Sequence, residues 1–116
     1  MAFRFEDLQV WQKALDLCDQ INRLTKNFPK DEVYVLTSQI KRAADSVVLN
    51  IAEGSTGQTK AVFKVFLGYA LRSGIEVVSC LFIARRRGYI EEPAFIEYYN
   101  EYEVLVKMIT ALRNSL

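Results

Sequence analysis

The chain has 116 residues, of which 51% are hydrophobic and 25% are charged; its formal net charge is +1 and it contains no histidine. This length suits one domain with its own core, and the composition is that of a globular protein rather than a disordered one. The near-neutral charge provides no global basic field that would attract nucleic acid, and the lack of histidine excludes histidine-dependent hydrolase triads and most zinc sites.

The first predicted element is a helix over about residues 7–28, which Pro29 closes. The residues before it show no apolar signal region. Cys18 and Cys80 both lie in apolar periodic segments, so we expect two buried thiols in a reducing cytoplasm. The apolar positions of this first helix recur at helical spacing and are Leu8, Trp11, Leu15, Cys18, Ile21 and Phe28.

The second predicted helix, over about residues 36–54 and closed by Gly54, carries two neighbouring lines of side chains. A catalytic site, a polar core network or a subunit contact would each explain why a polar line accompanies a good core stripe. The apolar line is Ile40, Ala44, Val47 and Ile51, and the polar line is Gln39, Ala43, Ser46, Asn50 and Glu53.

The third predicted helix, over about residues 59–87, stops at Gly88 and carries two apolar stripes. A surface helix of a bundle needs only one such stripe, so the second indicates deep burial or contact with another chain. Because a small bundle cannot bury every side of one helix, we expect contact with another copy of the chain rather than a monomer with an exposed apolar face. The apolar run 75–84 is interrupted by Glu76 and Ser79, and we expect it to be too short and too charged to span a membrane. The first stripe is Phe63, Leu67, Ala70, Gly74, Val77, Leu81 and Ala84; the second is Leu71, Ile75, Val78 and Phe82.

The fourth predicted helix, over about residues 93–115, begins with Pro93, a favoured residue in the first turn. Its apolar positions alternate at three and four residues, the period of left-handed helix pairs. The joints between all four helices are short, so neighbouring helices must be antiparallel. We therefore predict an all-α, up-down-up-down antiparallel four-helix bundle that forms a single domain over residues 1–116.

No catalytic, cofactor-binding or metal-binding residue is expected. A carboxylate-bridged di-iron bundle needs Glu-x-x-His on two helices, and residues 54–60 lack the glycine spacing and preceding strand of a phosphate loop. Glu53 and Glu76 would form an acid–base pair only if the end of one helix met the middle of the next. Hydrogen bonds between helices, which fix their register, are the simpler explanation of the polar line.

Charge is unevenly distributed over the second half of the chain. Basic residues dominate residues 60–87, and residues 91–103 carry acidic residues without a base. The arginines at 85–87 can complement the negative end of their helix, the basic and acidic surfaces can pair between subunits, or the basic residues can bind phosphate. The candidate phosphate contacts are Lys41, Arg42, Lys60, Lys64, Arg85, Arg86 and Arg87.

Several segments together resemble a known protein family. They are Phe5-x-Asp-Leu-x-Val-Trp-Gln-Lys-Ala14, Leu24-Thr-x-x-Phe-Pro29, residues 36–44, and Asn50-Ile-Ala-Glu-Gly54, with Lys60, Phe66, Leu67, Ala70, Ser73, Glu76, Ile83, Ala84, Gly88 and Tyr89. This pattern is similar to the small four-helix-bundle proteins encoded in intervening sequences of bacterial 23S ribosomal RNA genes. The resemblance covers nearly the whole chain.

The resemblance implies a ring-shaped homopentamer with no established enzyme activity. A related group, the accessory variability determinants of diversity-generating retroelements, is similar in fold, strongly basic, and binds nucleic acid and a reverse transcriptase; the net charge of +1 departs from that group. The partners implied are further copies of the chain, with RNA, DNA or a reverse transcriptase as alternatives. The residues expected to fix register and assembly are Gln39, Ser46, Asn50, Glu53, Ser73 and Glu76.

Overall fold

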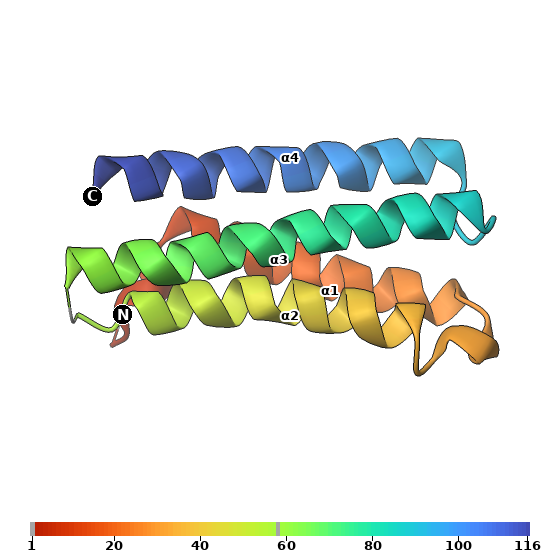
Figure 1. The fold of residues 1–116 in the computed structure, drawn as a ribbon, viewed down its shortest axis with the longest axis horizontal. Helices are drawn as coiled ribbons and strands as arrows, with labels where there is room; N and C mark the ends of the chain where they lie inside the picture. The colour runs from red at the N-terminus through yellow and green to blue at the C-terminus, as the bar shows by residue number, and fades with distance from the viewer. Residues whose placement is uncertain (1, 58) are drawn as a thin grey trace.

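The computed structural model describes residues 2–57 and 59–116 as an antiparallel bundle about 43 × 23 × 23 Å in extent (Figure 1). Its four long helices are α1 (Gln9–Leu24), α2 (Leu36–Gly54), α3 (Lys60–Arg86) and α4 (Glu92–Ser115). Three short 3₁₀ turns, η1 (Arg4–Asp7), η2 (Thr25–Asn27) and η3 (Lys30–Glu32), precede α1 or follow it. No strand occurs in the described parts of the chain, so the predicted fold class is confirmed.

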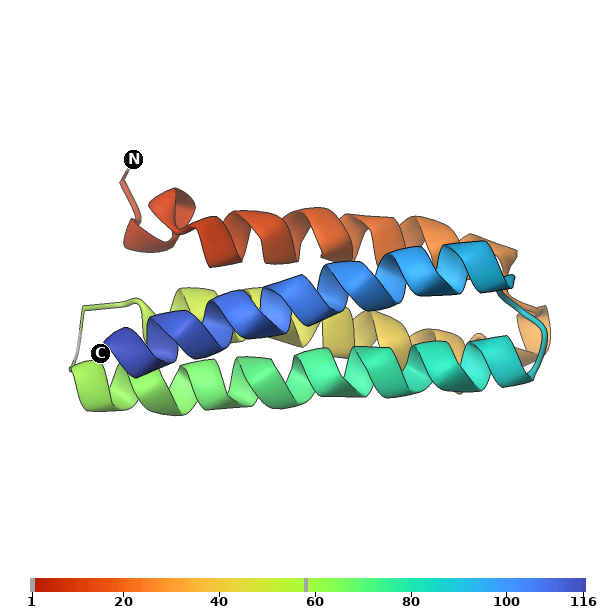
Figure 2. The same cartoon turned by 90° about the horizontal axis from the view of Figure 1, so that it is seen from above.

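The four helices form a square in which consecutive helices are neighbours. α2 and α3 share the most extensive contact, followed by α3 with α4 and α1 with α2, and α1 closes the square against α4. Figure 2, which views the molecule from above, shows α1 and α3 on opposite sides of α4. α2 and α3 therefore occupy adjacent corners of the bundle, and this arrangement determines which faces remain free.

The helix ends follow local signals. Thr59 precedes α3 in an extended conformation, and its hydroxyl accepts a hydrogen bond from the Val62 amide at 3.1 Å, so Thr59 caps the helix. α1 is shorter than predicted: it ends at Leu24, and the chain continues as η2. Phe28 is then extended because Pro29 disfavours a helical conformation in the residue before it.

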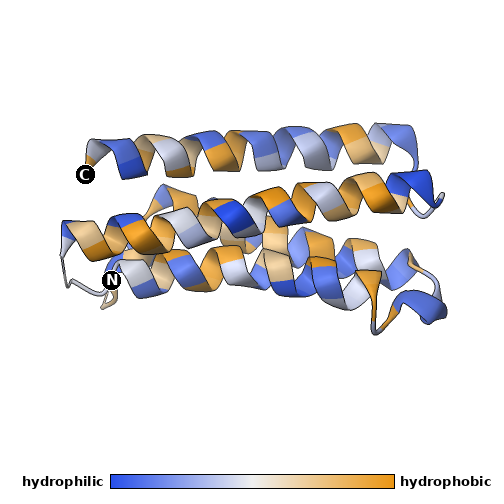
Figure 3. Ribbon diagram, in the orientation of Figure 1, coloured by the Kyte–Doolittle hydropathy of each residue, from blue (hydrophilic) through white to orange (hydrophobic). Residues whose placement is uncertain are grey.

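The core is built from the apolar stripes that face the bundle axis. Leu67, Val77 and Leu81 of α3 are fully buried, and each other helix contributes a comparable row. Figure 3 shows apolar and polar residues alternating along every helix as expected for elements half covered by neighbours. The largest fully buried side chains are Tyr102, Leu17, Ile21, Ile40, Ile51, Leu67, Leu81, Leu105 and Ile109.

The second apolar stripe of α3 is divided between the bundle and the solvent. Leu71 and Val78 pack against the core, whereas Ile75 is 60% exposed. Phe82 is 44% exposed, although its ring meets the edges or faces of Phe95 and Tyr99 of α4. The predicted stripe therefore follows the seam with α4, and only part of it is free for another chain.

α3 differs from the other described helices in that its length and composition would be sufficient to cross a bilayer. The run 75–84, which was expected to be too short to span a membrane, is only part of this 27-residue helix, and the longer helix meets the length criterion. One face of α3 packs into the bundle core, and its exposed face carries Arg72. A long core helix of a globular bundle meets the same length and composition criteria, and a mid-helix arginine is costly in lipid.

Candidate functional site

The polar line of α2 faces a matching polar line on α3. Gln39 of α2 donates a hydrogen bond to the carboxylate of Glu76, and Ser73 Oγ donates to Ser46 Oγ at 2.9 Å. These contacts lie in a shallow surface groove between the two helices, which Arg42 and Ala43 also line. The predicted hydrogen bonds between helices are therefore present, and they lie at the surface rather than in the core.

Asn50 acts within α2. Its amide nitrogen donates to the Ser46 carbonyl oxygen at 2.8 Å and to Ser46 Oγ at 2.9 Å, one helical turn earlier. In the single chain, the interhelical bond that was expected of Asn50 is instead made by Ser46. Asn50 positions the Ser46 hydroxyl that receives the hydrogen bond from Ser73.

Glu53 lies apart from this network. Its side chain is exposed and has no hydrogen-bond or ion-pair partner among residues 2–57 and 59–116. The adjacent Gly54 packs against Phe66, ten residues before Glu76 on α3. Ten residues correspond to about 15 Å along a helix, so Glu53 and Glu76 of one chain do not form an acid–base pair.

Arg85 and Arg87 take part in contacts within the bundle. The Arg85 guanidinium lies 3.2 Å from the Glu92 carboxylate and 4.0 Å from the centre of the Phe95 ring. Arg87 donates to Glu32 at 3.0 Å. Both side chains therefore have intramolecular partners, as expected if basic residues at the end of α3 serve the fold.

Glu32 is the centre of a polar latch between two connections. This carboxylate is only 8% exposed and accepts hydrogen bonds from the Tyr89 hydroxyl at 2.7 Å and from Arg87. The Tyr89 hydrogen bond, with smaller contributions from the Leu36 amide and the Arg87 charge, lowers the pKa of Glu32. The same hydrogen bond raises the pKa of Tyr89. We call Glu32, Arg87 and Tyr89 the latch.

The remaining candidate phosphate contacts do not form one patch. Lys60 and Lys64 are exposed at the start of α3, and Arg86 is exposed at its end, about 40 Å away for a helix of this length. Lys41 and Arg42 are exposed on different sides of α2, since Lys41 lines a groove shared with α1 and Arg42 lines the groove shared with α3. Within one chain, these basic residues therefore cannot all contact the same phosphate group.

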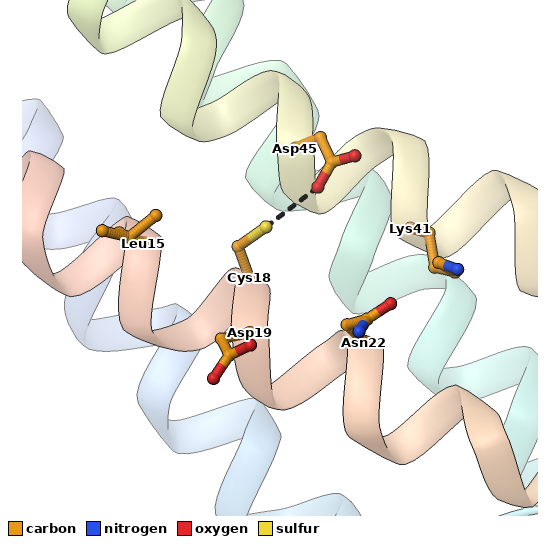
Figure 4. Close-up of a pocket in the computed structure, with 6 residues that line it drawn as sticks. All are labelled: Leu15, Cys18, Asp19, Asn22, Lys41 and Asp45. Carbon is orange, nitrogen blue, oxygen red and sulfur yellow. Dashed lines mark hydrogen bonds between the residues drawn. The ribbon is translucent and has the colours of Figure 1, made fainter.

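A second groove, between α1 and α2, was not predicted. Figure 4 shows the Cys18 thiol pointing at Asp45, to which it donates a 2.9 Å hydrogen bond. Burial, and then the Asp45 carboxylate, raise the pKa of Cys18 to about 12, so the thiol is a poor nucleophile. Within the described residues, no three Cys, Asp or Glu side chains are grouped to hold a metal ion. The groove is lined by Leu15, Cys18, Asp19, Asn22, Lys41 and Asp45.

Comparison with known proteins relates the chain to one family. The family model described as 23S rRNA-intervening sequence protein matches residues 6–111. Among solved structures, the chain is similar to a protein with unknown function from the S23 ribosomal protein family of Bacteroides thetaiotaomicron. That similarity has a TM-score of 0.84 and 25% sequence identity, and it covers 90% of this chain and 95% of the other. No curated protein matches the chain.

Proposed function

The chain belongs to the 23S rRNA-intervening sequence protein family, and on this premise we propose that it is a non-enzymatic protein that assembles with copies of itself into a ring, with five subunits as the expected number. The observation that carries the proposal is the exposed face of α3. Along this 27-residue helix, several large apolar side chains remain in solvent. They are Val65, Tyr69, Ile75, Phe82 and Ile83.

The energy available on this face is sufficient for association. Burying a large apolar side chain stabilises a complex by roughly 1.5–3 kcal/mol, so three or four such residues in each interface offset much of the cost of binding. The Cys18 thiol donates a hydrogen bond to Asp45, and Arg85 and Arg87 are paired with carboxylates, which supports a role for these side chains in the fold. We further propose that the assembly acts in the cytoplasm without a membrane partner.

Light scattering on a size-exclusion column tests the assembly. A chain of 13.3 kDa should elute at micromolar concentration with a mass close to a fixed multiple of that value. A single species at the monomer mass would overturn the proposal. A discrete oligomer with a number of subunits other than five would retain self-assembly and correct the stoichiometry.

A nucleic-acid-binding accessory function is the second candidate. Lys60 and Lys64 lie in the first turns of α3, where the helix dipole favours anions, and a ring would repeat these weak sites around its axis. Such binding should ignore base sequence and weaken steeply with salt. A reverse transcriptase would be a further partner in a retroelement setting.

Gel-shift assays with RNA and DNA at several salt concentrations test this second candidate. Replacing Lys60 and Lys64 with alanine should flatten the salt dependence, whereas Arg85→Ala should act mainly on folding stability because Arg85 pairs with Glu92. A wild-type protein that shifts neither nucleic acid at low salt would eliminate this candidate.

A further inference from the structure

The outer face of α3 combines apolar and basic side chains. Tyr69 and Ile75 are exposed on either side of Arg72, and Val65 and Lys64 continue the row toward the start of the helix. No acidic residue interrupts this row. We call Lys64, Val65, Tyr69, Arg72 and Ile75 the α3 face.

The outer face of α2 combines apolar and acidic side chains. Leu49 is 60% exposed, and Asp45 and Glu53 lie one turn to either side of it. Leu15, which is exposed on α1, lies in the same groove as Asp45. We call Leu15, Asp45, Leu49 and Glu53 the α2 face. Lys41, which lines the same groove, and Arg42 are exposed about one turn beyond Asp45, outside the stretch 45–53, so over that stretch the α2 face is the charge complement of the α3 face.

The two faces also match in height along the bundle. The Ser46–Ser73 hydrogen bond sets these two residues level, and Gly54 is level with Phe66. Because α2 and α3 are antiparallel, Leu49 is level with Ala70, and Asp45 is level with Gly74. Leu49 thus has the height of Tyr69 and Asp45 the height of Arg72, each within one or two residues, and Glu53 lies within about one turn of Lys64.

We propose that the α3 face of one copy docks on the α2 face of the next, with Asp45 against Arg72, Leu49 against Tyr69, and Glu53 near Lys64. This inference rests on the proposed self-assembly and specifies its interface. The contact joins two different surfaces, so it is heterologous and continues from subunit to subunit. Because the two faces have the same height, neighbouring copies are related without a shift along the bundle axis. The chain of contacts therefore closes into a ring instead of a helical filament.

The direction of the groove between α2 and α3 follows from this contact. The two docking faces are on adjacent corners of the bundle, so neighbouring subunits touch at these two corners, and the side between α2 and α3 lies inside the contacts. That side points to the ring axis. Gln39, Ser46, Ser73 and Glu76 then line a central channel, which explains why α2 keeps a polar line beside its core stripe.

The outer face of α4 is a weaker alternative for the acidic partner. It also exposes apolar side chains, Ile96 and Val104, beside Glu97 and Glu103. The contact of Gly74 with Val106, however, sets Lys107 at the height of Arg72, and Lys107 pairs with Glu103 of its own helix. Docking of the α3 face on α4 at equal height would therefore bring Arg72 of one copy against Lys107 of the next, two like charges.

Charge reversal with rescue tests the interface. In the full chain, Arg72→Glu and Asp45→Lys should each weaken assembly at least about tenfold, because facing like charges repel, and the double variant should recover most of the loss. Glu97→Lys, on α4, is the matched control and should assemble like the wild type. Circular dichroism on each variant separates loss of assembly from loss of folding.

Cross-linking tests the same interface independently of charge. In a chain with Cys18→Ala and Cys80→Ala, the pair Leu49→Cys and Tyr69→Cys should give, on oxidation, a ladder of covalent oligomers that stops at the ring size. Each single cysteine should give none, since a heterologous contact never brings identical residues together. Dimers from Leu49→Cys alone would overturn the inference.

The outcomes distinguish the inference from the proposal beneath it. A wild-type protein that is monomeric would contradict the proposed function itself. A wild-type oligomer that survives both charge reversals and gives no ladder retains the proposed function and overturns this interface. If both single variants fail to fold, the cross-linking experiment, which leaves Asp45 and Arg72 unchanged, decides the matter.

Discussion

The hydroxyl of Tyr89 donates a 2.7 Å hydrogen bond to Glu32 and thereby ties the connection between α3 and α4 to the connection between α1 and α2. Arg87 supports the same carboxylate at 3.0 Å. The two residues of this bond are 57 positions apart in the chain. The latch therefore fixes the relative position of the two halves of the bundle at one end.

The latch predicts how stability changes with pH. The pKa of Glu32 is lowered from its ordinary value of 4.5, so folding favours the carboxylate. Its contribution is complete above that pH and disappears as the pH falls through the lower folded-state pKa. Glu32→Gln should therefore be less stable than the wild type in urea unfolding at pH 7, and the difference should shrink in strong acid. Asp31→Asn, its exposed neighbour, is the control; an equal loss for both variants would argue against the latch.

Gly54 and Gly68 predict opposite effects of the same substitution. A Cβ atom on Gly54 would lie 2.7 Å from Phe66 Cβ and 2.9 Å from the Phe63 ring, so α2 and α3 would have to separate. Gly54→Ala should cost about 1–3 kcal/mol of folding stability. On Gly68, the Cβ atom would lie 3.6 Å from the end of the Arg113 side chain, and Gly68→Ala should gain up to about 1 kcal/mol from helix propensity. Chemical denaturation of the two variants provides the comparison.

The Ser46 hydroxyl predicts energetic coupling between Asn50 and Ser73, which contact it from two different helices. Ser73→Ala removes the interhelical hydrogen bond and should cost about 0.5–1.5 kcal/mol. Asn50→Ala should cost a similar amount, and the double variant should lose less than the sum because both act through Ser46. Ser79→Ala, exposed on α3, should be neutral. Strict additivity in a double-mutant cycle would mean that the three side chains are independent.

The cysteines predict slow thiol chemistry in the folded chain. Burial and the Asp45 carboxylate raise the pKa of Cys18 to about 12, and burial raises the pKa of Cys80 to about 11. Alkylation by iodoacetamide at pH 8 should therefore be slow and should accelerate in urea. Asp45→Asn should speed the reaction of Cys18 and leave Cys80 unchanged. Rapid labelling of Cys18 in the folded wild type would contradict the assigned hydrogen bond.

The fold was predictable because the apolar residues of its helices recur at helical spacing in the sequence. The first stripe of α3 repeats at helical spacing, and every member of it is buried. Periodicity specifies a face but not the neighbour that covers it. Leu71 and Val78 were therefore expected in a subunit contact, although they pack against the core of their own bundle, and the exposed Val65 and Tyr69 were missed.

The polar contacts were only partly predictable. Gln39, Ser46, Ser73 and Glu76 are spaced so that two helices face one another, which made their pairing foreseeable. Asn50 has the same spacing but satisfies its amide within one helix, an option that spacing does not exclude. Glu32 and Tyr89 lie in connections whose residues follow no helical spacing, so no sequence pattern predicted the latch.

The latch also bears on the order of events during folding. Helix hairpins of neighbouring segments form early because they close short loops, whereas a contact that spans 57 residues must wait for the bundle to assemble. Its energy should thus be absent from the folding transition state. Tyr89→Phe should accelerate unfolding in stopped-flow experiments and leave the folding rate nearly unchanged. On this view, the tie between Glu32 and Tyr89 governs chiefly how long a folded subunit persists.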